Sequence, residues 1–73
     1  MGLHHASILT DLERDGEDIE IEATAEVYIG SNYGPYAEPT TVSNLRIWPV
    51  VRPSPTEREI NRIKDLLVEE ARS

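Results

Sequence analysis

The chain has 73 residues, no cysteine and a net charge of −7. This length allows a single domain, residues 1–73, with a small core, and the lack of cysteine excludes disulfides and thiolate metal sites. No stretch approaches the ~20 apolar residues needed to cross a bilayer, so we expect a soluble, cytosolic protein. The charge is polarised. Residues 1–40 hold nine acids and one base, whereas residues 41–73 hold five acids and six bases. Such a field favours a basic partner and disfavours nucleic-acid phosphates, although acidic surfaces also simply keep small proteins soluble.

The first segment of the chain has the weakest pattern. Residues 1–6 show little periodicity, and we expect them to be disordered. Residues 7–13 fit either a short strand or a helical turn. Asp15-Gly16 follows, and this pair favours a hairpin turn because glycine adopts positive φ at no cost and aspartate tolerates it. The turn predicts that residues 7–13 pair antiparallel with the segment that follows.

Residues 18–29 alternate between apolar and polar side chains without a break. This period of two predicts a half-buried strand. One face carries Ile19, Ile21, Ala23, Ala25, Val27 and Ile29, and the other carries Glu20, Glu22, Thr24, Glu26 and Tyr28. Like charges on one face repel each other and add nothing to the fold. The row of carboxylates therefore indicates either a gain in solubility or a surface that meets a basic partner.

The middle of the chain combines a long loop with a third strand. Residues 30–41 are rich in breakers, and loops of this length are often functional or mobile. Residues 42–51 read as a strand in which Leu45 and Ile47 share one side, while Arg46 and Trp48 share the other. Because proline has no N–H to donate, Pro49 predicts that this strand lies at an edge of the sheet.

The C-terminal segment predicts a helix from Pro55 to Ala71. Ser54, Pro55 and Glu57 fit the N-cap, first and third positions of a capping box. An apolar stripe follows at helical spacing and would cover the apolar face of 18–29 together with Leu45 and Ile47. The fold class expected is α+β: a three-stranded antiparallel sheet (7–13, 18–29, 42–51) with a C-terminal helix packed on one face.

Catalytic chemistry finds no support in the sequence. His4 and His5 sit in an end expected to be mobile, where no partner orients them. The serines have no base in a nucleophile motif, and no glycine-rich phosphate loop is present. The paired carboxylates lie on a face predicted to meet solvent rather than in a pocket. We therefore expect no enzyme, no catalytic residue, no cofactor and no metal.

The aromatic residues point to protein binding instead. Tryptophan, tyrosine and arginine are enriched at interface hot spots, and here they accompany the carboxylate row. The alternative is that Trp48 and Tyr28 only cover the second face of a thin sheet, and that the loop tyrosines pack over the core edge. The candidate protein-binding residues are Glu20, Glu22, Glu26, Tyr28, Tyr33, Tyr36, Arg46 and Trp48.

Several strings of the chain resemble small proteins of tailed bacteriophages. They are Arg14-Asp15-Gly16-Glu17-Asp18-Ile19-Glu20-Ile21, a Pro/Gly/Tyr-rich gap, Val42…Leu45…Pro49-Val50 and Ser54-Pro55-Thr56-Glu57-Arg58-Glu59-Ile60. Within this group, the length and acidity are similar to those of the host RNA-polymerase-binding transcription regulator of a Xanthomonas lytic phage. The resemblance implies a protein of the bacterial host cytoplasm that binds the large polymerase subunits and blocks initiation by interfering with the σ factor. It also implies antitermination, that is, read-through of terminators.

Other classes of function remain open from the sequence. One is an acidic nucleic-acid mimic that inhibits another host protein, for whose surface duplex DNA would compete. The other is a small structural phage component that assembles by a free strand edge. In each case we expect no direct nucleic-acid binding and no membrane partner. We also expect a monomer, except for the structural component, which predicts a concentration-dependent oligomer.

Overall fold

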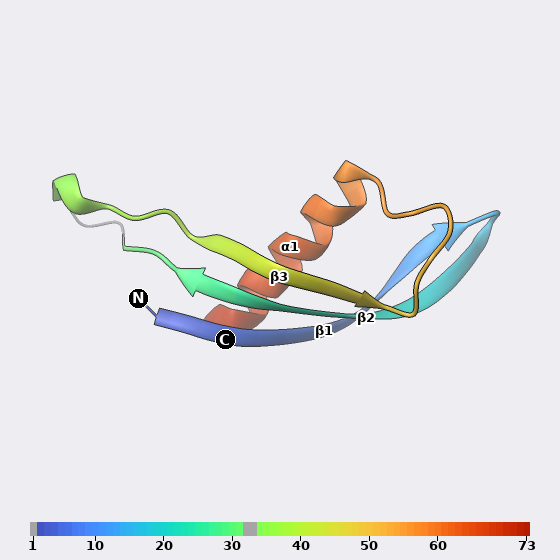
Figure 1. Ribbon diagram of the computed structural model, residues 1–73, viewed down its shortest axis with the longest axis horizontal. Coiled ribbons are helices and arrows are strands. Elements are labelled where there is room, and N and C mark those ends of the chain that lie inside the picture. Colours follow the sequence, from blue (N-terminus) through green and yellow to red (C-terminus); the bar gives the residue numbers. More distant parts are fainter. Residues whose placement is uncertain (1, 32–33) are drawn as a thin grey trace.

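The computed structural model describes residues 2–31 and 34–73. Strands β1 (Gly2–Arg14), β2 (Glu17–Ile29) and β3 (Thr41–Trp48) form one antiparallel sheet in the order β1-β2-β3. A short 3-10 helix, η1 (Gly34–Tyr36), interrupts the connection between β2 and β3. Helix α1 (Glu57–Arg72) packs across β1 and β2, as Figure 1 shows, in a molecule of 47 × 19 × 18 Å. The predicted α+β architecture is confirmed.

A two-residue turn joins β1 to β2. Asp15 and Gly16 both have positive φ, 52° and 79°, as a type I′ turn requires. The ladder then runs without interruption from the Arg14–Glu17 pair to the Gly2–Ile29 pair. The strand expected over 7–13 is therefore longer at both ends, and the expected disorder of residues 1–6 is wrong for residues 2–6. The physical reason is that alternate residues along the whole of β2 offer ladder hydrogen bonds to the strand that precedes the tight turn.

Strand β3 is an edge strand, as predicted, but it ends at Trp48 rather than at residue 51. A bulge interrupts it: Thr24 pairs with Arg46 and Glu26 with Ser43, so Ala25 faces two residues of β3. Asn44 adopts the left-handed conformation there, with φ of 53°. The bulge shifts the alternation by one residue. As a result, Val42 packs against the core together with Leu45 and Ile47.

The core lies between α1 and the hairpin. Its buried members are Ala6, Leu12, Ile21, Ala23, Ala25, Val27, Val51, Ile63 and Leu67. The prediction that the helix covers Leu45 and Ile47 needs correction, because α1 packs on β1 and β2 and leaves these two residues half-buried at the margin. There they line an apolar groove of about 260 Å³ beside Val51, Pro55 and Ile60. The bulged strand β3 thus lies outside the main cover of the helix.

The helix begins two residues later than the predicted capping box. Thr56, not Ser54, is the N-cap: its Oγ1 accepts from the Glu59 amide at 3.2 Å, and Glu59 Oε1 accepts from the Thr56 amide at 2.9 Å. Glu59, not Glu57, therefore completes the box. Pro55 precedes the N-cap and is not the first helical residue. The sequence contains two overlapping boxes, Ser54–Glu57 and Thr56–Glu59, and in the second Glu59 is also held by Arg14 from the end of β1.

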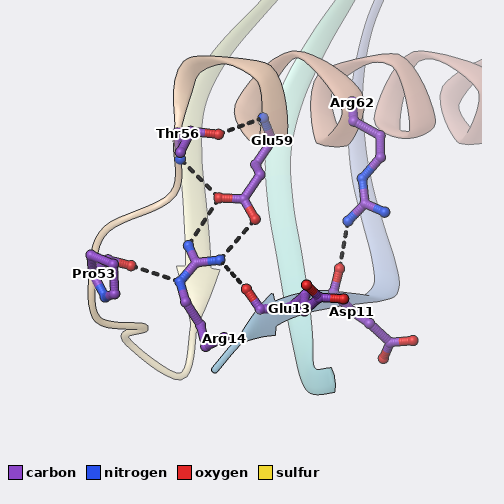
Figure 2. Close-up of polar contacts among 7 residues, drawn as sticks. All are labelled: Asp11, Glu13, Arg14, Pro53, Thr56, Glu59 and Arg62. Carbon is purple, nitrogen blue, oxygen red and sulfur yellow. Dashed lines mark hydrogen bonds and ion pairs between the residues drawn. The ribbon is translucent and has the colours of Figure 1, made fainter. Parts of the chain in front are cut away.

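Arg14 joins three separate segments, as Figure 2 shows. Its guanidinium donates to both carboxylate oxygens of Glu59 at 2.8 and 2.9 Å, and its Nε donates to the Pro53 carbonyl at 3.0 Å. The two side chains are only 11 % and 23 % exposed. The hydrogen bonds from Arg14 and from the Thr56 amide lower the pKa of Glu59 to about 2. This bidentate pair fastens the turn end of the hairpin to the start of the helix.

Candidate protein-binding face

The side of the sheet that faces away from α1 forms an open face. Three residues lie in one row across it, because Leu9 and Trp48 are the cross-strand partners of Glu22 on either side. Leu9 is 71 % exposed and Trp48 is 70 % exposed. Directly opposed residues of neighbouring strands share a face and approach closely. A carboxylate therefore lies between two apolar side chains that meet solvent.

The next row of the open face carries Arg46. It pairs with Thr24, which pairs in turn with Ser7. Together with His5, Glu26 and Asn44, these residues line a shallow hollow of about 480 Å³. Within the described residues, no ion pair joins this arginine to a carboxylate, and Glu26 accepts a hydrogen bond from the Asn44 side-chain amide at 2.9 Å. The centre of the face is therefore polar, and it holds Arg46 and Glu26 around one hollow.

Towards the hairpin turn the open face becomes strongly acidic. Asp11 is the cross-strand partner of Glu20, and Glu13 is the partner of Asp18. Like charges directly opposite each other destabilise a sheet. Neither Glu20 nor Glu22 has a hydrogen-bond or ion-pair partner among residues 2–31 and 34–73. This end of the face therefore concentrates negative charge. Asp11, Glu13 and Asp18 share a hollow with Arg58 and Arg62 of α1, whereas Glu20 and Glu22 have no such neighbour in the described structure.

At the opposite end of the face, Tyr28 donates a hydrogen bond to the Glu38 carboxylate. This bond, followed by the negative charge of Glu38, raises the pKa of the Tyr28 hydroxyl. The contact ties the residues before β3 to the end of β2. Gly30 also allows the backbone at Glu38 to lie close to the end of β2. A Cβ at this position would lie 1.9 Å from the Glu38 carbonyl oxygen, so only glycine fits.

The structure brings six of the eight sequence-predicted binding residues to one face. They are Glu20, Glu22, Glu26, Tyr28, Arg46 and Trp48. Tyr33 lies outside the described residues. Tyr36 closes η1 through its backbone, and its side chain is not among those described.

Sequence analysis missed the contribution of β1 to this face. Leu3, His5 and Leu9 lie opposite Tyr28, Glu26 and Glu22, and both leucines are exposed. The signal was present in the two-residue turn at Asp15-Gly16. Such a turn fixes the register, so each polar residue of β2 identifies its partner on β1 by simple counting.

The described residues offer no grouping typical of metal chemistry. No cluster of three or more histidine, aspartate or glutamate side chains there is arranged to hold a metal ion. No helix in this part of the chain is long and apolar enough to cross a membrane.

Comparison with known proteins adds no relative. No protein-family model matches the chain, and neither a curated protein nor a solved structure shows significant similarity to it.

Proposed function

We propose that this protein is a non-catalytic binding module whose open face docks on a positively charged surface of another protein. The observation that carries the proposal is the row Leu9–Glu22–Trp48, in which a carboxylate lies between two exposed apolar side chains. A lysine or arginine of a partner can place its aliphatic stem on such side chains, meet the face of the indole and pair with the carboxylate.

The acidic end of the face supplies the attraction over longer range. Two pairs of acids oppose each other across β1 and β2, an arrangement that costs stability. A basic surface would relieve this repulsion on binding. Exposed charges of this kind mainly speed encounter and are screened over ~8–10 Å at ordinary ionic strength, so association should weaken as salt rises.

The partner we propose is host RNA polymerase. This choice is based on the resemblance to small tailed-phage proteins, which implies binding to the large subunits, interference with the σ factor and read-through of terminators. The open face supports the proposal to the extent that it offers an acidic surface with an aromatic anchor.

Binding can be tested with matched variants. Reversing Glu20, Glu22 and Glu26 to lysine should slow association at least about tenfold. The same reversal at Asp65, Glu69 and Glu70, three exposed acids of α1, changes the net charge equally and should have a smaller effect. Trp48→Ala should speed dissociation by about thirtyfold if the indole is a buried anchor. Val50→Ala is its control, because Val50 is equally exposed.

The polymerase partner needs a separate experiment. Transcription from a promoter is measured with purified polymerase and σ factor, with and without the protein, and polymerase subunits are sought in a pull-down. The proposal is supported if the unchanged protein lowers the amount of transcript and the Trp48→Ala variant does not. Unchanged transcript and no polymerase subunit in the pull-down would remove the polymerase, whereas capture of a DNA-binding protein in competition with duplex DNA would favour the nucleic-acid mimic.

A further inference from the structure

The sheet has two edges, and they differ. The edge of β3 is distorted by the bulge at Asn44 and ends before Pro49, two features that protect an edge strand from pairing. Strand β1 is regular: its register with β2 runs from Gly2 to Arg14 without a shift. A long regular edge is the kind that accepts another strand.

Only part of the β1 edge is open. Because Arg14 and Glu17 flank a two-residue turn, they form a hydrogen-bonded pair, and such pairs alternate along an antiparallel ladder. The odd-numbered residues of β1 therefore direct their backbone N–H and C=O groups away from β2. Two of these carbonyls are occupied by arginines: Arg62 donates to that of Asp11, and Arg14 donates to that of Glu13 (Figure 2).

The other half of this edge has no such cap. Among the residues that the structure describes, none bonds to the outward backbone groups of Leu3, His5, Ser7 or Leu9. These four residues are spaced symmetrically about Ala6. Residues 2–10 also contain no aspartate, glutamate, lysine or arginine, so a second strand can approach here without meeting a fixed charge.

We propose that the segment Leu3–Leu9 pairs antiparallel with the same segment of a second copy, about a two-fold axis at Ala6. This register places Leu3 opposite Leu9 and His5 opposite Ser7 in both halves, and each outward N–H and C=O gains a partner. The result is one six-stranded sheet with β1 at its centre. The inference concerns the free protein and does not depend on the proposed partner.

Self-pairing fits this edge because its exposed side chains complement themselves. Leu3 and Leu9 are 59 % and 71 % exposed, and the two-fold register brings each against the other. Asp11 and Glu13 fall beyond the paired segment, so the acids of two negatively charged copies do not oppose each other. A two-fold interface uses the β1 edge of both copies, and the bulged β3 edges stay outermost. Association should therefore stop at a dimer, in contrast to the monomer expected from the sequence.

Light scattering over a range of concentrations measures the mass of the protein in solution and tests the proposal. The protein should shift from monomer to dimer as concentration rises. Ser7→Pro removes one outward N–H and leaves the ladder with β2 intact, so the dimer dissociation constant should rise at least about tenfold while circular dichroism stays unchanged. Leu9→Lys should weaken the dimer, whereas Val50→Lys should not, although both positions are 71 % exposed.

Cysteine crosslinking tests the register, because the chain has no cysteine of its own. Directly paired residues have Cα atoms about 5.5 Å apart, within disulfide range. A mixture of Leu3→Cys and Leu9→Cys proteins should therefore form mixed disulfides, and Leu3→Cys alone should not. A monomer at every concentration, a dimer unaffected by Ser7→Pro, open-ended oligomers or crosslinking of Leu3→Cys with itself would each overturn the proposal.

Discussion

The two faces of β2 belong to one continuous strand, yet they differ in burial and in charge. On the side of α1, Ile21, Ala23 and Val27 are almost completely buried. On the other side, Glu20 and Glu22 meet solvent without partners in the described structure. Apolar burial on one face holds the fold, so the other face can keep an arrangement of charges that a stability argument alone would reject. The comparison separates the residues that fold this chain from those that can bind.

The largest expected difference between the faces comes from two neighbouring residues. Ile21→Asp places a charge without a partner at a position only 1 % exposed, and it should unfold the domain. Glu22→Lys changes an exposed residue and should alter the free energy of unfolding by no more than about 0.5 kcal/mol. Thermal melts of the two variants measure this. Equal behaviour would show that the two faces are wrongly assigned.

A smaller difference is expected when large side chains are truncated on each face. Leu67 of α1 is fully buried, so Leu67→Ala should cost about 2–5 kcal/mol. Trp48→Ala removes a larger but exposed side chain and should cost about 0.5 kcal/mol or less. Urea titration of both proteins gives the two values. If Trp48→Ala lowers the free energy of unfolding as much as Leu67→Ala does, the indole covers the sheet and stabilises the fold instead of being free to bind a partner.

The smallest expected effect is the dependence of stability on pH, and it comes from the side of the sheet that α1 covers. The hydrogen bonds that lower the pKa of Glu59 to about 2 favour its carboxylate in the folded state over the unfolded state. This stabilisation is present above the ordinary pKa near 4.5 and is lost as pH falls from there towards 2. Over that range Glu59→Gln should lose less stability than the unchanged protein.

The control for the acid experiment is Glu57→Gln. Glu57 is also in the first turn of α1 but is exposed and makes no contact with Arg14. Between pH 2 and 7, the free energy of unfolding of Glu57→Gln should depend on pH in the same way as that of the unchanged protein. The same curve for Glu59→Gln would show that the contact with Arg14 adds no pH-dependent stability.

Local patterns predicted much of the fold. The alternation of residues 18–29 identified β2 and assigned its faces correctly, and the apolar stripe identified α1. The Asp15-Gly16 pair placed the turn. These signals come from neighbours in the sequence, so no long-range contact was needed to interpret them.

The errors arose where distant residues decide the outcome. The first six residues have no pattern of their own, and residues 2–6 are ordered by β2. The helix start shifted from Ser54 to Thr56, where Glu59 also meets Arg14 from another strand. The bulge at Asn44 shifts the alternation of β3 by one residue, and this strand has no glycine that would have signalled a bulge. Of the binding residues, those on β2 and β3 could be predicted from alternation, whereas those on β1 required the register.

The contacts of Arg14 also bear on the order in which the chain folds. The hairpin closes around two residues, whereas Arg14 reaches Pro53 and Glu59 across 39 and 45 residues of chain. Closing so long a loop is entropically costly, and we expect these bonds to form after the main barrier to folding has been crossed. Interactions absent from the transition state act on the unfolding rate. Arg14 would then serve as a latch: it would set how long the native state persists and leave the speed of folding almost unchanged.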